Sequence, residues 1–503
     1  MRDKVRVSRT VAVALLLAAL LVLGGARTAS ALWEDPDFIE KMLGPPNING
    51  IVGNGQLLAG ISARGELTLL RWPNPSFYDQ VRYFTVSREL PRFGAKENYG
   101  SFAGVVVQDA GGKTTIWLRD DPWVCTQNYP ESHSAALVTE CVHPDLGIGV
   151  EQRDFVVPHD DVLVRRYLIT RGPQSPDVVG FIYFENMAPC TDKIPFAPVY
   201  DWLLDPLNDF GLVYVGDRGA LLHFKPYGES TPPETLPADP YAIDAMYPGG
   251  GVFIAIGSDR TPSSHQCGIE DAESGSSADA YICSQNGWLL NNDSCTGRCT
   301  GALAFDLDPA ATEQEIDILI ALSDGAQPAL GLLDEYRTRP APELEAEADE
   351  YWQDWIDGIP MPDADDDRLL FVCKRGLIAI KQLTYERTGA IMAAASTQPP
   401  YAEDWPRDGA FINYALDLAG LYDMVESHNA FYLSVQRDSG TLGMCYYADG
   451  MVAGPIPFEI DEIAFIVWTW WLHSRFIEDP NERLEYLSAV YRGIKRAAEF
   501  LVR

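Results

Sequence analysis

The spacing of apolar residues changes once along this chain, and that change limits the folds it can adopt. Before about residue 338, apolar and β-branched residues alternate in short runs cut by Gly, Pro, Asn and Asp, which is the period of half-buried strands. After about residue 366, apolar residues recur every three or four positions, as in amphipathic helices. One continuous layer cannot satisfy both periods, so the sequence predicts a multidomain chain of β then α type.

The strand-like half spans residues 32–338 and predicts a large antiparallel β-sandwich. The stretch "GQLLAGISARGELTLLRWP" is typical of a hairpin that turns at residues 63–65, and "DVLVRRYLITRG" is rich in β-branched residues. No repeat of about 20 to 50 residues is evident, which favours a sandwich over a propeller. Residues 339–366 are rich in acid and proline, and we expect a linker there with a short helix around residues 351–356.

Residues 367–503 predict a series of helices whose starts carry acidic residues. The aspartates at 365–367 can cap a first helix. Further helices are expected after Asp404, Glu459 and Asp479, and the last of these has Pro480 at its first position, where proline is favoured. The apolar stripe of this last helix is predicted to comprise Leu484, Leu487, Tyr491, Ile494, Ala498 and Leu501.

The first 31 residues have the pattern of a secretory signal peptide. Basic residues precede the apolar run 11–23, and Ala29-Ser30-Ala31 matches the small-residue rule for cleavage. A run of thirteen apolar residues is shorter than the roughly 20 that a spanning helix needs, so an uncleaved membrane anchor is the weaker alternative. The sequence therefore predicts a secreted or periplasmic protein that begins near Leu32 and keeps no stable membrane span.

The charge balance excludes one class of partner. The chain holds 72 Asp and Glu residues against 38 Lys and Arg residues, a formal net charge of −34. A surface this acidic repels phosphate backbones and anionic lipid headgroups. Nucleic acid is therefore not expected as a partner.

Nine cysteines are unevenly spread along the chain, and export would place them in an oxidising compartment. Several fall between residues 267 and 299, where His265 could join them in a zinc site. We favour a surface loop pinned by disulfides, because structural disulfides are common in exported chains, and no metal or cofactor is expected. The sequence leaves the pairing open.

A charged pair behind two aromatic residues marks the first candidate site. In "YAEDWPRDG", Tyr401 and Trp405 precede Arg407 and Asp408 at an expected helix start. The helix dipole favours an aspartate there and disfavours an arginine, so the arginine needs another reason. A guanidinium and a carboxylate can together hold vicinal hydroxyls, while the aromatic rings offer flat apolar faces to a sugar ring. The alternative is an Arg407–Asp408 salt bridge that orders the helix start.

The second candidate site is the helix start in "PFEIDEIAFIVWTWWLHSRF". Glu459, Asp461 and Glu462 crowd its first turn, and interaction with the helix dipole would by itself explain acids there. The helix that follows is too apolar to be exposed on all sides, so these acids would face whatever cavity the helices enclose. Three tryptophans of this helix are predicted as core more than as a sugar platform, namely Trp468, Trp470 and Trp471.

Several stretches resemble glycoside hydrolase family 15, the glucoamylase and glucodextranase group, and the likeness extends over nearly the whole mature chain. "IVGNGQLLAGISARGELTLLRWPNPSF" and "EQRDFVVPHDDVLVRRYLIT" are similar to the N-terminal β-sandwich of its prokaryotic members. "AIMAAASTQPPYAEDWPRDGAFINYALDLAG" is similar to the join between the first two helices of the catalytic (α/α)6 barrel. The resemblance implies that residues 367–503 form the N-terminal portion of such a barrel.

The same resemblance implies roles for individual residues. Tyr401 would stack beneath the sugar at the cleaved end, Arg407 and Asp408 would hold its hydroxyls, and Trp405 would line the pocket. The later helix start resembles a pocket-lining segment, although Glu459 stands where prokaryotic relatives tend to have Gln. The remaining substrate-binding residues implied there are Asp461 and Glu462.

The activity implied by the resemblance is that of an exo-acting, inverting glycoside hydrolase for α-glucosidic oligo- or polysaccharides. Such enzymes use a carboxylic acid and a carboxylate roughly 6.5 to 9.5 Å apart. In the family both follow the helix that here is "NERLEYLSAVYRGIKRAAEFLVR", so the catalytic acid and base are expected beyond residue 503. The alternative is a non-catalytic secreted carbohydrate-binding or surface protein built on part of this scaffold.

Overall fold

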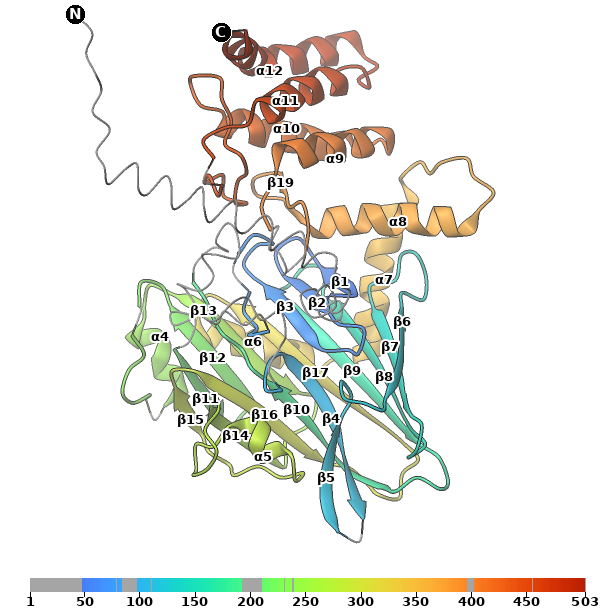
Figure 1. Cartoon of the computed structure of the whole chain (residues 1–503), viewed down its shortest axis with the longest axis vertical. Coiled ribbons are helices and arrows are strands. Elements are labelled where there is room, and N and C mark those ends of the chain that lie inside the picture. The colour runs from blue at the N-terminus through green and yellow to red at the C-terminus, as the bar shows by residue number, and fades with distance from the viewer. Residues whose placement is uncertain are drawn as a thin grey trace, which may run out of the picture.

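Large antiparallel sheets come first in the chain and helices follow, as the change of period predicts (Figure 1). The computed structural model describes residues 48–77, 79–83, 97–109, 111–191, 210–229, 231–237, 239–395, 402–454 and 456–502. The predicted signal peptide, residues 1–31, and Tyr401 lie outside the described residues.

The first sheet has eight antiparallel strands within the described residues. Its order is β1-β2-β3-β4-β10-β16-β14, and β5 pairs with β4. The predicted hairpin is confirmed, because β2 pairs with β3 and Gly65 adopts a φ of 80° in the turn between them. The strands of this sheet are β1 (Gly50–Gly53), β2 (Leu58–Ile61), β3 (Leu67–Arg71), β4 (Ser101–Asp109), β5 (Gly112–Trp117), β10 (Asp177–Glu185), β14 (Ser264–Ile269) and β16 (Cys299–Asp306).

The second sheet has nine antiparallel strands within the described residues, in the order β15-β11-β12-β13-β17-β9-β8-β7-β6. It faces the first sheet across a shared apolar core, where the rings of Tyr167 and Phe181 lie 5.0 Å apart and both side chains are fully buried. The strands are β6 (Val124–Asn128), β7 (Leu137–His143), β8 (Ile148–Val156), β9 (Val162–Arg171), β11 (Gly211–Val215), β12 (Ala220–Pro226), β13 (Gly251–Ser258), β15 (Ser294–Thr296) and β17 (Glu313–Ser323).

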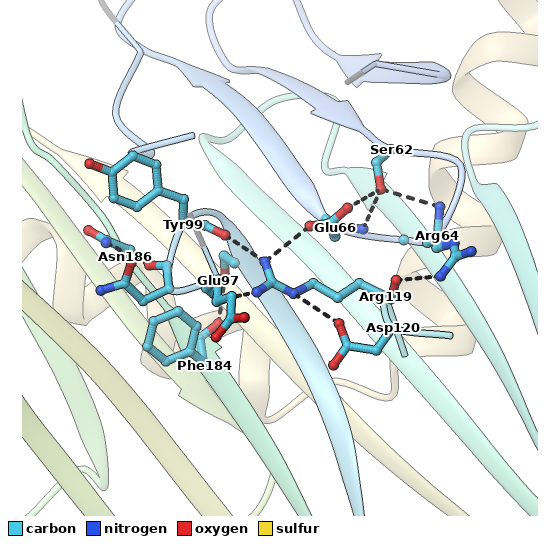
Figure 2. Close-up of polar contacts among 12 residues, drawn as sticks. Ser62, Arg64, Glu66, Glu97, Tyr99, Arg119, Asp120, Phe184 and Asn186 are labelled. Carbon is cyan, nitrogen blue, oxygen red and sulfur yellow. Dashed lines mark hydrogen bonds and ion pairs between the residues drawn. The ribbon is translucent and has the colours of Figure 1, made fainter. Parts of the chain in front are cut away.

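An arginine fastens one end of the first sheet (Figure 2). Nη1 of Arg119 donates to the carbonyl oxygen of Tyr99 at 3.0 Å and lies 3.4 Å from Oε1 of Glu66. The guanidinium carbon lies 3.8 Å from the centroid of the Phe102 ring. Burial raises the pKa of the Glu66 carboxyl, and the Arg119 charge opposes that shift. The contacts tie the turn before β3 to β4 and to the chain after β5.

Two helices cover the outer face of the second sheet, and one of them corrects the predicted linker. The helix expected around residues 351–356 is present, but it is longer than predicted, because α7 (Ala341–Asp357) is 17 residues long. Its side chains at four-residue spacing pack beside α6 (Ala326–Arg337) against the sheet, and Arg153 on β8 donates to Glu345 at 2.9 Å. The short helices of this unit are η2 (Pro240–Ala242), α4 (Ile243–Met246) and α5 (Ala280–Ser284).

The remaining helices stack above one end of the sandwich (Figure 1). They are α8 (Asp367–Gln382), α9 (Pro406–Leu418), α10 (Tyr422–Val435), α11 (Ile460–His473) and α12 (Pro480–Leu501), and a short hairpin of β18 (Thr384–Tyr385) and β19 (Ala390–Ile391) lies between the first two. Within the described part of the chain, no helix is both long enough and apolar enough to cross a membrane.

The predicted apolar stripe of the last helix is confirmed only in part. Leu487, Ile494 and Leu501 pack against the core, but Leu484 and Tyr491 are 65% and 63% exposed. The helix instead turns a face of smaller residues inward, because a Cβ at Gly493 would lie 2.7 Å from the ring of Trp470 on α11. The buried side of α12 comprises Tyr486, Val490, Gly493 and Ala497.

The helical unit shares a core with the sandwich. Leu58 and Leu69 from the first sheet belong to the same buried cluster as Tyr432 on α10. The guanidinium carbon of Arg375 on α8 lies 3.6 Å from the centroid of the Tyr129 ring. These contacts hold the helical unit against the sheets.

Two disulfides are present among the described residues. Cys125–Cys141 joins β6 to β7, and Cys295–Cys299 closes a short loop. The predicted cysteine-rich loop is therefore pinned at one end only, since Cys267 and Cys283 form no disulfide.

Candidate functional site

The segment before α9 carries the first predicted site, and one expectation about it is wrong. Asp404 does not cap the helix, because α9 begins at Pro406 with Trp405 in the N-cap position. Asp404 is fully buried instead, where it accepts a hydrogen bond from the Tyr432 hydroxyl at 2.6 Å and lies 2.8 Å from Nε2 of His428. Buried side chains of α10 therefore bind the Asp404 carboxylate, which the sequence pattern had assigned to capping α9.

Arg407 joins the starts of α9 and α11. Its Nε donates to Oδ2 of Asp461 at 2.8 Å, and its Nη2 donates to Oε2 of Glu459 at 3.1 Å. The same Nη2 lies 3.6 Å from Oε1 of Glu462. The two candidate sites predicted from the sequence, at the starts of α9 and α11, therefore form one site. The alternative of an Arg407–Asp408 salt bridge is not the arrangement observed, since the acids that bind Arg407 come from α11.

The acids around Arg407 have unequal environments. The Asp461 side chain is 55% exposed, and its hydrogen bond with Arg407 lowers its pKa. Glu462 is fully buried, and this burial, followed by repulsion from Glu459, raises its pKa to about 9. Near pH 7 Glu462 is therefore a neutral acid beneath the guanidinium, whereas Asp461 is a carboxylate at the surface.

Glu403 is a second buried acid, which the sequence analysis did not single out. Its side chain is fully buried, and this burial raises its pKa to about 7 although the charge of Arg71 on β3 opposes the shift. Trp405 lies beside it and is 8% exposed. The only sequence signal for Glu403 is the pair of consecutive acids before Trp405. This signal is weak, because acids are common just before helices.

The other predicted residues fall in different environments. Asp408 is exposed on the first turn of α9, while Tyr401 is among the residues that are not described. The tryptophans of α11 divide, since Trp470 is fully buried in the core as predicted but Trp471 is 53% exposed. Trp468 packs edge to face with Tyr414 of α9, with ring centroids 6.0 Å apart.

The chemistry that the site offers is hydrogen bonding beside apolar rings. Guanidinium N–H groups and carboxylate oxygens can donate to and accept from hydroxyl groups at once. Across the described ranges, no three or more His, Cys, Asp or Glu side chains are grouped so as to hold a metal ion.

Comparisons with known proteins find similarity to glycosyl hydrolases as a broad group. No protein-family model matches the chain. An uncharacterised glycosyl hydrolase of Methanocaldococcus jannaschii is 25% identical over 466 residues, which cover 90% of this chain and 63% of that protein.

Two solved structures share the fold. A bacterial glucoamylase complexed with acarbose matches with a TM-score of 0.65 and 12% identity, over 90% of this chain and 58% of that one. A proposed kojibiose phosphorylase from the human microbiome matches with a TM-score of 0.53 and 9% identity, over 89% of this chain and 56% of that one.

The chain thus spans about three fifths of the length of these relatives. Its two sheets and its helices match a glucoamylase-like architecture over the described residues. The chain is glycosyl-hydrolase-like, with the fold of the glucoamylase-like enzymes.

Proposed function

We propose that this chain is part of an exported, exo-acting glycoside hydrolase of the glucoamylase type, which cleaves α-glucosidic oligo- or polysaccharides with inversion. The observation that carries the proposal is the placement of Arg407, which follows Trp405 by two residues in the chain and is held by acids from a second helix start. A planar fork of donors between carboxylates beside an aromatic residue suits the vicinal hydroxyls of a sugar.

Exposure supports the proposed roles of the polar residues, because Arg407, Asp408 and Asp461 have exposed polar atoms that would hold sugar hydroxyls. The apolar faces are assigned to Tyr401 and Trp405 by the family resemblance alone. Glu462 is fully buried, so in this proposal it acts on the sugar through Arg407.

Hydrolysis with inversion also requires an acid for the leaving oxygen and a base for water. The resemblance to glycoside hydrolase family 15 assigns both to the part of the barrel that follows α12. The relatives are longer than this chain, so the activity of a whole enzyme is part of the proposal.

Titration calorimetry with acarbose tests the sugar site in the 503-residue chain. We expect saturable binding by the wild type and loss of binding in Arg407→Ala. Arg368→Ala is the matched control, because Arg368 also lies in the first turn of a helix and its side chain is 92% exposed. Equal affinities in all three proteins, or no binding by the wild type, would refute the assignment of the site. Binding without hydrolysis by a lengthened chain would favour a carbohydrate-binding protein instead.

A further inference from the structure

A buried hydrogen-bond network lies beneath the segment that leads into α9. Oδ1 of Asp404 accepts from the Tyr432 hydroxyl at 2.6 Å, and Oδ2 accepts from the backbone N–H of Ile391 at 2.9 Å. The same Oδ2 lies 2.8 Å from Nε2 of His428, and Nδ1 of His428 lies 2.8 Å from Oδ1 of Asn413. Asp404, His428 and Asn413 have no exposed surface. The network thus connects this segment to both α9 and α10.

Both ring nitrogens of His428 have a partner in the network. Asn413 donates through Nδ2 to Asn429 at 3.1 Å and to Thr469 at 3.2 Å, so its oxygen is the atom that faces the histidine. The other ring nitrogen faces Asp404, whose oxygens both accept. Both ring nitrogens therefore lie within hydrogen-bonding distance of a side-chain oxygen. His428 and Asp404 form a buried hydrogen-bonded pair.

A buried polar pair is weak evidence for stability, because removing its polar groups from water offsets most of their attraction. Its best-attested use is to select one arrangement of the surrounding groups. Gly409 on α9 supports this second use. A Cβ at Gly409 would lie 1.8 Å from the Tyr432 hydroxyl oxygen and 2.8 Å from Cε1 of His428. Glycine at position 409 lowers the helix propensity of α9, but it leaves the space that Tyr432 and His428 need to form the network.

We propose that Asp404 and His428 are positioning residues of the sugar site. Asp404 immediately precedes Trp405, and its backbone N–H and C=O pair with Tyr446 at 2.8 and 2.9 Å. The hydrogen-bonded pair therefore holds Trp405 and the first turn of α9 against α10, and so places the Arg407 guanidinium at the acids of α11. This inference rests on the proposed function, because it assigns to the pair a role in the same site.

The helical unit carries a second buried His–Asp pair, which is a matched control. Nδ1 of His473 lies 2.5 Å from Oδ1 of Asp417, and both side chains are buried. This pair joins the last turn of α11 to the last turn of α9, whereas Arg407 lies in the first turn of α9. Its loss should affect folding stability without moving Trp405 or Arg407.

The test compares His428→Gln with His473→Gln in the 503-residue chain labelled with 5-fluorotryptophan. Three quantities are measured: the thermal midpoint, the dissociation constant of acarbose, and the fluorine resonance of Trp405, which Trp405→Phe assigns. We expect both variants to melt earlier. We expect only His428→Gln to weaken acarbose binding, by about tenfold or more, and to shift or split the Trp405 resonance.

An unchanged Trp405 resonance and affinity in His428→Gln, or equal changes in His473→Gln, would overturn the proposal. If the wild type binds no acarbose, the proposed function fails, but the fluorine resonance still decides whether the pair positions Trp405. Tyr432→Phe serves if His428→Gln does not fold, because it removes one hydrogen bond to Asp404 and keeps the ring. We expect it to move the same resonance less far, and no movement there would also count against the proposal.

Discussion

Arg407 binds two carboxylates through different nitrogens, at 2.8 Å to Asp461 and 3.1 Å to Glu459. The ammonium of a lysine cannot reproduce this planar fork. We predict that Arg407→Lys weakens acarbose binding by about tenfold to a hundredfold, which corresponds to a charge-assisted hydrogen bond worth about 1.5 to 3 kcal/mol. The thermal midpoint should fall only slightly, because the side chain is 40% exposed. A large fall in the midpoint with unchanged affinity would instead indicate a role in helix packing alone.

The buried acid beneath Arg407 predicts a pH dependence of stability. Burial raises the pKa of Glu462 from 4.5 to about 9. Between these values the unfolded chain is ionised at this group while the folded chain keeps its proton. The folded state then binds more protons, so stability from Glu462 is complete below about pH 4.5 and is lost as the pH rises towards about 9.

We therefore predict that Glu462→Gln flattens the fall in the free energy of unfolding between about pH 5 and 9, by up to about 1.4 kcal/mol per pH unit. Urea unfolding at several pH values measures this slope. Glu485→Gln is the control, because Glu485 is exposed on α12 and its substitution should leave the slope as in the wild type. Parallel slopes for wild type and Glu462→Gln would contradict the prediction.

At the scale of elements, glycines set the distances between helices. A Cβ at Gly409 would lie 1.8 Å from the Tyr432 hydroxyl oxygen, whereas one at Gly376 in α8 would meet nothing within 4 Å. Alanine is better than glycine in a helix by about 0.8 to 1.0 kcal/mol. We predict that Gly376→Ala raises the thermal midpoint and that Gly409→Ala lowers it, because the clash exceeds the gain in helix propensity. A stabilised Gly409→Ala would show that α9 and α10 can separate at no cost.

Local patterns predicted the helix starts that depend only on local bonds. Asp366 accepts from the backbone N–H of Arg368, and Asp479 accepts from that of Asn481, as the capping patterns indicated. The same pattern failed at Asp404, because its partner His428 is 24 residues away and nothing local reveals it. The sequence therefore identifies an aspartate that could cap a helix. It does not reveal that the same carboxylate accepts hydrogen bonds from residues distant in the chain.

The buried faces of helices were harder to predict than their positions. The stripe of large apolar residues predicted for α12 is partly exposed, because the helix faces the core with the side that carries Gly493, where the Trp470 ring approaches closely. In α7 the acidic composition concealed a true buried stripe of Leu344, Ala348, Trp352 and Ile356. At the site, the sequence identified Arg407 and the α11 acids separately, and only the fold shows that they meet.

At the scale of the whole molecule, export remains a prediction. The disulfide Cys125–Cys141 supports it, since structural disulfides are rare in reducing compartments. We predict that the exported protein begins near Leu32, after the Ala29-Ser30-Ala31 motif. N-terminal sequencing of protein from the medium or periplasm measures this, and a product that keeps Met1 would contradict it.

The final prediction concerns turnover by the whole chain. An inverting glycosidase needs an acid and a base on opposite sides of the sugar, roughly 6.5 to 9.5 Å apart. Glu459, Asp461 and Glu462 cannot supply both, because they crowd one helix start and all lie within 3.6 Å of Arg407.

Residues 32–503 should therefore release no glucose above background from maltooligosaccharides, isomaltooligosaccharides or trehalose. A chain extended by the helices that the longer relatives carry should release glucose from at least one of them, and coupled glucose assays on both proteins measure the difference. Sustained turnover by residues 32–503 would mean that an acid and a base lie within this chain, and would refute the assignment of both to later helices.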